Sequence, residues 1–238
     1  MLQIRYQNQI YQFIPHDNIK LKNEGTYGNG SIDWAPRGLS LDQIAAQVGV
    51  LQPIAARINK KIVPLDTFIT KNCEVEFITL SDAEGQMMLR RTGIFLLNYA
   101  AMQVFPSDYQ LIESNMLSQY TVYTDFILPE AACITDADLE SIQNVIIKIL
   151  QEDTKIVAKK LPYFRAVREA KALNRLYLLR SIEMNDDGSS PVSVYMLHDY
   201  FDLDSEPLLL DIQMIKELKN LRVEKKFDRN RIIAELCV

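Results

Sequence analysis

A long helix is the strongest local signal in the chain, and it is expected to begin at Ser81 and to end before Pro106. Ser81 and Glu84 have the spacing of a capping box, which marks a helix start. Arg91 and Phe95 stand four residues apart and therefore share one face of this helix. Because Arg keeps its proton in proteins and Phe has no lone pair, this face is not expected to bind a metal or to perform acid–base catalysis.

The composition indicates an ordinary globular protein. Of the 238 residues, 48% are apolar and 24% are charged, which allows one large or two small domains. The net charge of −5 argues against a surface that coats nucleic acid, but it leaves room for a local basic face. The three cysteines share no close spacing, so neither a disulfide framework nor a metal site is expected, and no cofactor is predicted.

The sequence pattern shows neither a membrane span nor an export signal. The first six residues alternate as a strand does, rather than forming a basic and then apolar signal region. No apolar run reaches the ~18 residues that a membrane helix needs. We therefore expect no membrane partner and a reducing, cytoplasmic location.

Residues 1–80 are expected to form a small β-rich unit with one helix. Alternating runs at 3–8 and 9–15 predict a hairpin, and residues 16–38, rich in Asn, Asp, Gly and Pro, predict a loop insertion. A second capping box, which opens at Ser40, predicts the helix. Three further strands, the first two forming another hairpin, are expected at 54–59, 61–64 and 74–79. The outline is that of a ubiquitin-like β-grasp.

Residues 81–210 are expected to form a second unit that mixes helices with strands, so the predicted fold class is α+β. After the long helix, Thr135 caps another helix in which apolar residues recur at helical spacing. The other elements predicted are strands at 120–128, 155–160 and 192–197 and helices at 136–152 and 162–180. Residues 211–238 have mixed charge and a helical pattern, which predicts a C-terminal helical tail.

Three segments, in this order, resemble the N-terminal half of bacterial threonyl-tRNA synthetase. The first lies within residues 40–79, begins SLDQIA, and is similar to the TGS domain of that family. The second, EG at 84–85 and LLNYA at 96–100, is similar to a helix of the family's editing domain. The third, YTDF at 123–126, resembles a strand of the same domain. The resemblance implies a TGS-like domain followed by an editing-like domain.

The departures from that family concern the editing site. There the site combines two His residues on the long helix with a later Cys and His in one short motif. The matching positions in this chain hold Arg91, Phe95, Asp204 and Leu208. All four are replaced, and the resemblance, which covers roughly residues 1–210 apart from the insertion, does not include the class II catalytic domain. We therefore expect neither deacylation of mischarged tRNA nor aminoacylation.

The same two domains also resemble the N-terminal region of bacterial nucleoside kinases and a large-subunit protein of mitochondrial ribosomes, in which the editing ligands are eroded. No G-x-x-x-x-G-K-[ST] phosphate loop occurs in the sequence, so kinase chemistry would have to come from another chain. The acidic charge and the missing transit peptide count against the ribosomal protein.

Lys and Arg gather between residues 153 and 180, where only Asp153 and Glu169 are acidic. On a helix, Arg165, Arg168 and Arg175 would lie within an arc of about 80°, with Lys171 roughly 40° farther round, so this stripe could follow the phosphates of RNA. The alternative is a solvated helix face. The aromatic residues Tyr163, Phe164 and Tyr177 could stack on bases, but their spacing favours core packing. The RNA-binding candidates are Lys159, Lys160, Arg165, Arg168, Lys171 and Arg175.

Four residues could line the relic cleft of the editing-like domain and favour an anionic ligand, namely Arg91, Asp125, His198 and Asp204. Our leading hypothesis is a non-catalytic binding module for RNA or tRNA, a nucleotide or a protein partner. Two alternatives stay open. One is a hydrolase that acts on an aminoacyl or nucleotide ester through His198 and Asp125. The other is a detached regulatory domain of a nucleoside kinase or a synthetase.

Overall fold

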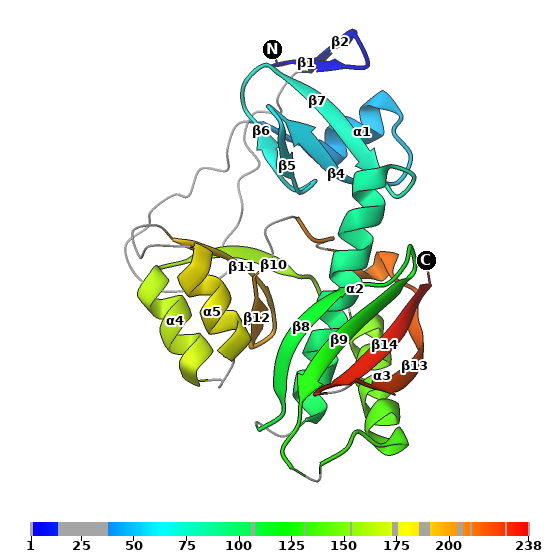
Figure 1. Ribbon diagram of the computed structural model, residues 1–238. Helices are drawn as coiled ribbons and strands as arrows, with labels where there is room; N and C mark the ends of the chain where they lie inside the picture. The colour runs from blue at the N-terminus through cyan, green and yellow to red at the C-terminus, as the bar shows by residue number, and fades with distance from the viewer. Residues whose placement is uncertain are drawn as a thin grey trace, which may run out of the picture. The chain divides into compact units, whose positions relative to one another are not determined.

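The computed structural model describes residues 2–13, 38–105, 108–130, 132–152, 154–172, 176–185, 191–203, 207–209, 211–226 and 228–237 (Figure 1). Contacts between residues divide the chain into two compact units, 1–85 and 86–238. Both units contain helices and strands, which confirms the predicted α+β class. The predicted insertion at 16–38 lies outside the described residues except for Gly38. None of the helices among the described residues is long and apolar enough to span a membrane.

The first unit is built on a mixed five-stranded sheet with the strand order β2-β1-β7-β4-β5. Its strands are β1 (Leu2–Tyr6), β2 (Gln9–Phe13), β4 (Pro53–Ile58), β5 (Lys61–Val63) and β7 (Cys73–Thr79). The strands β1 and β7 run parallel, and the other neighbours run antiparallel. A separate short pair is formed by β3 (Leu39–Ser40) and β6 (Phe68–Ile69).

Two-residue turns close the two hairpins of this sheet, and both hairpins were predicted. Gln7 and Asn8 join β1 to β2, and Asn59 and Lys60 join β4 to β5. All four residues have positive φ, at 47°, 64°, 50° and 68°. Turns with two positive φ angles match the right-handed twist of the strands, and Asn tolerates this conformation.

Helix α1 (Leu41–Val48) packs against the core of the first unit. The Ser40 hydroxyl accepts the backbone N–H of Gln43, whose side chain accepts the Ser40 N–H, so the predicted capping box is confirmed. Ile44 is fully buried in the same apolar cluster as Val75 of the sheet. One helix against a mixed sheet fits the expected β-grasp outline, which stays a prediction.

The long helix α2 (Ala83–Val104) begins at the end of the first unit and continues through the second. Its start differs from the predicted capping box. The Glu84 carboxylate pairs with Arg57, and the Asp82 carboxylate accepts the backbone N–H of Thr79 at 2.6 Å. Asp82 therefore closes a turn directly before the helix.

In the second unit, α2 lies against an antiparallel sheet with the strand order β13-β14-β9-β8. The strands are β8 (Gln110–Met116), β9 (Thr121–Ile127), β13 (Glu217–Lys225) and β14 (Asn230–Cys237). Gly93 permits the close approach, because a Cβ there would lie 2.5 Å from a methyl group of Leu236. Nearby, Ser114 Oγ lies 3.0 Å from both Asn98 Oδ1 on α2 and Thr124 Oγ1 on β9.

Helix α3 (Asp136–Gln151) lies against β13 of the same sheet. Thr135 and Asp138 form a capping box at its start, as predicted for Thr135. Its buried face is formed by Ile142, Ile146 and Ile149, and the Gln143 side chain donates a hydrogen bond of 2.6 Å to the Leu218 carbonyl.

A smaller antiparallel sheet, β10-β11-β12, carries a pair of helices on one face (Figure 1). These elements are β10 (Val157–Leu161), β11 (Val192–Leu197), β12 (Tyr200–Asp202), α4 (Tyr163–Ala172) and α5 (Leu176–Asn185). Ala166 and Leu178 of the helices are buried with Val194 and Phe201 of the strands. The single helix predicted at 162–180 is therefore wrong, because two helices pack on this sheet.

The C-terminal tail is not helical, contrary to the prediction for 211–238. After a single 3-10 turn, η1 (Ile212–Met214), the chain forms the β13–β14 hairpin, and β14 also pairs with β9. Lys and Glu, which favour helices, are frequent in β13, but the fully buried Leu218 places this strand on the core. The buried Ile232 and Ala234 of β14 show that sheet pairing overrides local propensity here.

Candidate nucleic-acid interface

The α2 face, which we define by Arg91, Phe95 and Tyr99, is closed by aromatic packing. The Phe95 ring is 4% exposed and meets the Tyr200 ring edge-on with centroids 5.1 Å apart. The Tyr99 ring lies 5.7 Å from the same Tyr200 ring, at 86°. Edge-to-face contacts of this kind stabilise a packed core. Phe95 is thus a core residue, and Arg91 beside it is half-buried.

The segment 207–209 packs beside the α2 face. The backbone N–H of Leu209 donates to Thr92 Oγ1 at 2.8 Å, and the Thr92 hydroxyl donates to the Met88 carbonyl one turn earlier. Leu208, at a position where the resemblance expects a His, is 2% exposed. This position therefore also belongs to the core.

His198 lies beside Tyr99, a residue in the C-terminal half of α2. Its backbone has φ of +54°, and its Nδ1 lies 3.1 Å from the Tyr99 hydroxyl. Its Nε2 lies 3.6 Å from Glu152, which can form an ion pair only when the imidazole is protonated. Burial raises the pKa of Tyr99 above the usual phenol value, and the charges of Asp199 and Glu152 raise this pKa further. The hydroxyl that contacts His198 is therefore a neutral phenol at neutral pH.

Asp125 lies on the opposite face of the four-stranded sheet from α2. Its neighbour Thr124 contacts Ser114 and, through it, Asn98 of α2, and successive residues of a strand point to opposite faces. The Asp125 carboxylate is fully buried and accepts two hydrogen bonds from Arg231, at 2.7 and 2.8 Å. The structure therefore does not bring Asp125 together with Arg91 and His198. Asp204 lies outside the described residues.

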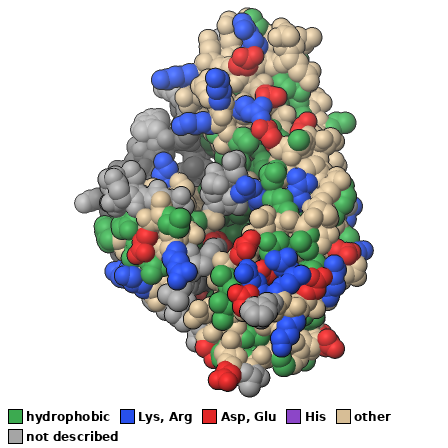
Figure 2. Space-filling view, in the orientation of Figure 1, with side chains coloured by type: hydrophobic (Ala, Val, Ile, Leu, Met, Phe, Trp, Pro, Cys, Tyr) green, Lys and Arg blue, Asp and Glu red, His purple; other side chains and the backbone are tan. Residues whose placement is uncertain are grey.

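The sheet face around Asp125 carries a network of compensating charges. The Arg231 guanidinium lies 3.6 Å from the centre of the Tyr123 ring, and the Tyr123 hydroxyl donates to Glu113 at 2.9 Å. Arg229 reaches both Asp125 and Glu113, at 3.4 and 3.5 Å. Hydrogen bonding to Asp125 raises the pKa of Arg231, and burial raises that of Tyr123. Figure 2 shows the two signs of charge interleaved over these strands, so this surface offers no net attraction for an anion.

A different surface, on α4, is rich in cations. We define the α4 outer face by four exposed residues, Phe164, Arg165, Arg168 and Lys171. Arg165 Nε pairs with Glu169 at 2.7 Å, one turn later, whereas Arg168 and Lys171 form no ion pair with any residue that the structure describes. Figure 2 shows Lys and Arg side chains over this helical pair. Of the six predicted cations, Arg165, Arg168 and Lys171 lie on this face.

The strand before α4 carries two more of the predicted cations. Lys159 and Lys160 are exposed on β10, which is an edge strand of its sheet, and only Leu161 and Pro162 separate them from α4. Arg175 lies outside the described residues, as does the side chain of Tyr177. All the other RNA-binding candidates are therefore solvent-exposed.

The expectation of core packing was wrong for one aromatic residue of this region. Phe164 is 72% exposed, whereas its neighbour Tyr163 is half-buried against the core formed by Ala166 and Ala170. The helix turns its alanines toward the sheet, and Phe164 therefore projects on the side of the cations.

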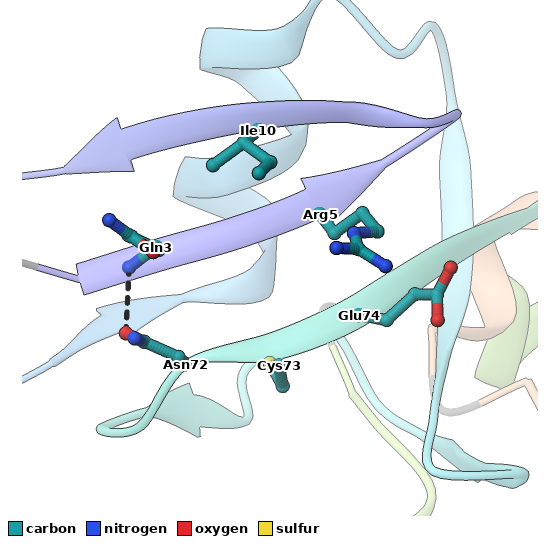
Figure 3. Close-up of a pocket in the computed structure, with 6 residues that line it drawn as sticks. All are labelled: Gln3, Arg5, Ile10, Asn72, Cys73 and Glu74. Carbon is teal, nitrogen blue, oxygen red and sulfur yellow. Dashed lines mark hydrogen bonds between the residues drawn. The ribbon is translucent and has the colours of Figure 1, made fainter.

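The first unit has a shallow hollow on its sheet, shown in Figure 3. Arg5 and Glu74, of opposite charge, both line it, and so does Ile10, which is 58% exposed. Asn72 accepts the backbone N–H of Gln3 at 2.9 Å, which ties the start of β1 to β7. This hydrogen bond is structural.

Comparison with known proteins gives related sequences but no matching family model. Threonine–tRNA ligase from Symbiobacterium thermophilum is 26% identical over 83% of this chain, that from Finegoldia magna 30% over 71%, and that from Clostridium tetani 27% over 89%. This chain is related to threonine–tRNA ligases. It spans about a third of the length of these relatives, covering 30%, 26% and 33% of them.

In this ligase-related chain, the structure describes three of the four positions that the resemblance assigns to the editing site. Arg91 and Phe95 share the α2 face, and Leu208 adjoins the residue that bonds to Thr92 on the same helix. Asp204, the fourth, lies outside the described part. Within the ranges that the structure describes, no group of three His, Cys, Asp or Glu residues could hold a metal ion.

Sequence reasoning missed one buried polar pair of the ligase-related chain. The Tyr200 hydroxyl donates to Asp202 Oδ2 at 2.7 Å, and the backbone N–H of Leu203 donates to Asp202 Oδ1 at 2.8 Å. Tyr200 and Asp202 are only 2% and 5% exposed. Tyr200 and Asp202 alternate with Phe201, a pattern that could have indicated a strand buried on both faces. The sequence does not show that Tyr99 packs on the Tyr200 side, which only the structure reveals.

Proposed function

We propose that this chain is a non-catalytic, threonyl-tRNA-synthetase-like module that binds RNA, with tRNA as the expected partner, through the α4 outer face. One observation carries the proposal. Arg168 and Lys171 are exposed on one side of α4 and have no acidic partner in the described part of the chain. Cations left without a partner in a protein of net charge −5 are available to phosphates.

The absence of catalysis is argued from the α2 face. Phe95 fills the space beside Arg91 with a ring that packs on Tyr200, and a phenylalanine ring offers neither a proton nor a lone pair. Leu208 is buried in the same region. A ligand would have to displace core side chains before it reached this face.

The relationship to threonine–tRNA ligases supports tRNA as the partner, and it supports a TGS-like domain at 1–80 followed by an editing-like domain at 81–210. In this view the editing-like scaffold was kept while its site residues were replaced, because a fold can outlast the site that it carries. The cations that we propose for binding lie on α4 and are separate from the α2 face.

The two alternatives have less support. A hydrolase that uses His198 with Asp125 would need both side chains at one ester, but Asp125 is held by Arg231 on the far side of the sheet from α2. A regulatory role beside a kinase or synthetase subunit would need a protein surface, and the exposed Phe164 is the residue that such a partner would contact.

The experiment that tests the proposal is the binding of bulk tRNA to the full chain at about 50 and 200 mM salt, measured by fluorescence anisotropy. Two phosphate contacts should weaken binding roughly tenfold between these concentrations. The variant Arg168→Glu/Lys171→Glu should lose most of the affinity and most of its salt dependence.

The matched control is Lys216→Glu/Lys225→Glu, which changes the net charge equally. Both lysines are exposed in the same unit, away from α4 in sequence and without an ion pair in the described ranges. If the control loses as much affinity as the α4 variant, binding follows net charge and the proposed site is wrong. If the unmodified chain does not bind tRNA at the lower salt concentration, the proposed function is wrong.

A further inference from the structure

We propose that the α4 outer face binds unpaired nucleotides, with the Phe164 ring stacking on a base while Arg168 and Lys171 contact the phosphates on either side. This inference rests on the proposed function and specifies its ligand as single-stranded rather than duplex RNA. The residue concerned is Phe164, whose exposed ring has no role in packing the core.

The geometry of the helix places the ring among the cations. At 100° per residue, Phe164, Arg168 and Lys171 lie within an arc of about 60° on α4. Along the axis, Arg168 is about 6 Å and Lys171 about 10 Å from Phe164. A base stacked on the ring would therefore carry its backbone past two positive charges. The face offers an apolar ring and two ionic contacts in one short row.

The core does not need Phe164 at this position. The side of α4 that faces the sheet is formed by Ala166 and Ala170, with Tyr163 and Val167 packed beside them. Phe164 is 72% exposed, although aromatic side chains of this size are usually buried. An exposed aromatic ring beside uncompensated cations is the combination that single-stranded nucleic acids use, because every base has a face that can stack.

A duplex would not use this ring. Its base faces are already stacked inside the helix, so it could contact only the cations of the α4 outer face. Lys159 and Lys160 are exposed on β10 just before α4, but alternation along the strand points them to opposite faces of the sheet. Arg165 contributes less, since Glu169 already holds its guanidinium. The ring is thus the feature that distinguishes the two forms of RNA.

The test compares a labelled single-stranded RNA of about ten nucleotides with a fully paired hairpin of similar length, using the full chain and fluorescence anisotropy. We expect the unmodified chain to prefer the single strand. Phe164→Ala should weaken binding to the single strand roughly tenfold and leave the weaker hairpin binding unchanged. Phe164→Trp should restore it.

The tryptophan variant also reports stacking directly. The chain has one Trp of its own, so the difference between the emission of Phe164→Trp and that of the unmodified chain comes from position 164. Single-stranded RNA should quench this difference, and the hairpin should not. Phe68→Ala, which truncates a phenylalanine that is 49% exposed in the first unit, is the matched control and should bind as the unmodified chain does.

The outcomes separate the two proposals. If Phe164→Ala binds the single strand as tightly as the unmodified chain, or if the hairpin binds equally well, the stacking proposal is overturned and the RNA-binding function stands. If neither RNA binds, the stacking proposal and the RNA-binding function are both overturned. Phe164 would then be tested as a contact residue for a protein partner. Circular dichroism of each variant must match the unmodified chain, and Phe164→Trp keeps the test valid if the alanine variant misfolds.

Discussion

The α2 face and the α4 outer face both belong to helices of the second unit, but they differ in what surrounds their aromatic residue. Phe95 on α2 is 4% exposed and packs edge-on against Tyr200, whereas Phe164 on α4 is 72% exposed. Each phenylalanine lies four residues from an arginine on its helix, Phe95 from Arg91 and Phe164 from Arg168. The surrounding packing therefore decides which ring stabilises the fold and which is available to a ligand.

This difference has a consequence for the relationship to threonine–tRNA ligases. The resemblance directs attention to the α2 face, because the family's editing residues stand there. On the α4 outer face, Arg168 and Lys171 have no acidic partner among the described residues. A relationship to a family thus indicates where that family's site stands, while charge and exposure indicate where binding is possible in this chain.

Truncation of the two rings should give the largest contrast. Phe95→Ala removes a buried ring and should lower the free energy of unfolding by about 4 kcal/mol, because it leaves a cavity. Phe164→Ala should change it by less than about 0.5 kcal/mol, because the ring is exposed. Urea unfolding of both variants measures these changes in the free energy of unfolding. Equal losses of stability would mean that the two rings are not packed differently.

Asp125 should behave as a structural residue of the sheet and not as part of a site. Asp125→Ala leaves Arg231 without its buried partner, and it should cost about 3 kcal/mol in urea unfolding. Glu113→Ala, whose carboxylate is half exposed on the same face, should cost at most about 1 kcal/mol. A variant lacking Asp125 that kept full stability would reopen a functional role for this carboxylate.

The contact between Tyr99 and His198 should make a smaller contribution to the free energy of unfolding, and this contribution should depend on pH. Tyr99→Phe removes one hydrogen bond and should lower stability by about 1 kcal/mol near pH 8. Because burial raises the pKa of Tyr99 in the folded chain, its contribution is complete below the pKa of an unfolded tyrosine, about 10, and is lost as the pH rises beyond it.

The difference in the free energy of unfolding between Tyr99→Phe and the unmodified chain should therefore decrease as the pH is raised above about 10. Denaturant midpoints at a neutral and an alkaline pH measure it, and the other tyrosines contribute equally to both chains. A difference that stays constant across this range would show that the Tyr99 phenol is not held neutral by its surroundings.

Arg91 and Phe95, the two α2 positions at which the resemblance expects His, provide the smallest expected effect. The variant Arg91→His/Phe95→His places two imidazoles four residues apart, but zinc sites need at least a third protein ligand. Leu208 supplies none. We expect no zinc affinity above that of the unmodified chain in a competition assay with a chelating dye. Tight zinc binding would show that the face is open and that nearby residues complete a site.

Local signals in the sequence predicted those parts of the fold that local chemistry determines. The capping boxes at Ser40 and Thr135 and the positive-φ turn at Asn59 could be recognised because side-chain hydrogen bonds and turn preferences act within a few residues. Pairing between distant segments could not be recognised in this way. The strands β13 and β14 were predicted as helix, since their Lys, Glu and Leu residues favour helices until β9 offers a partner.

The candidate site divides in the same way. The inability of Arg91 and Phe95 to bind a metal follows from side-chain chemistry alone, and the stripe through Arg168 and Lys171 follows from helical spacing. The exposure of Phe164 does not, because Tyr163 beside it is equally aromatic and only packing on the smaller sheet decides which ring is covered. The position of Asp125 depended on strand register, which the sequence does not specify.

The central claim is that binding belongs to the α4 outer face and not to the α2 face. The most direct test compares the affinity for bulk tRNA of Arg168→Glu/Lys171→Glu with that of Arg91→Ala, at about 50 mM salt. The account predicts at least a roughly tenfold loss for the α4 variant and an unchanged affinity for Arg91→Ala. A loss confined to Arg91→Ala, in a variant that is folded by circular dichroism, would contradict it.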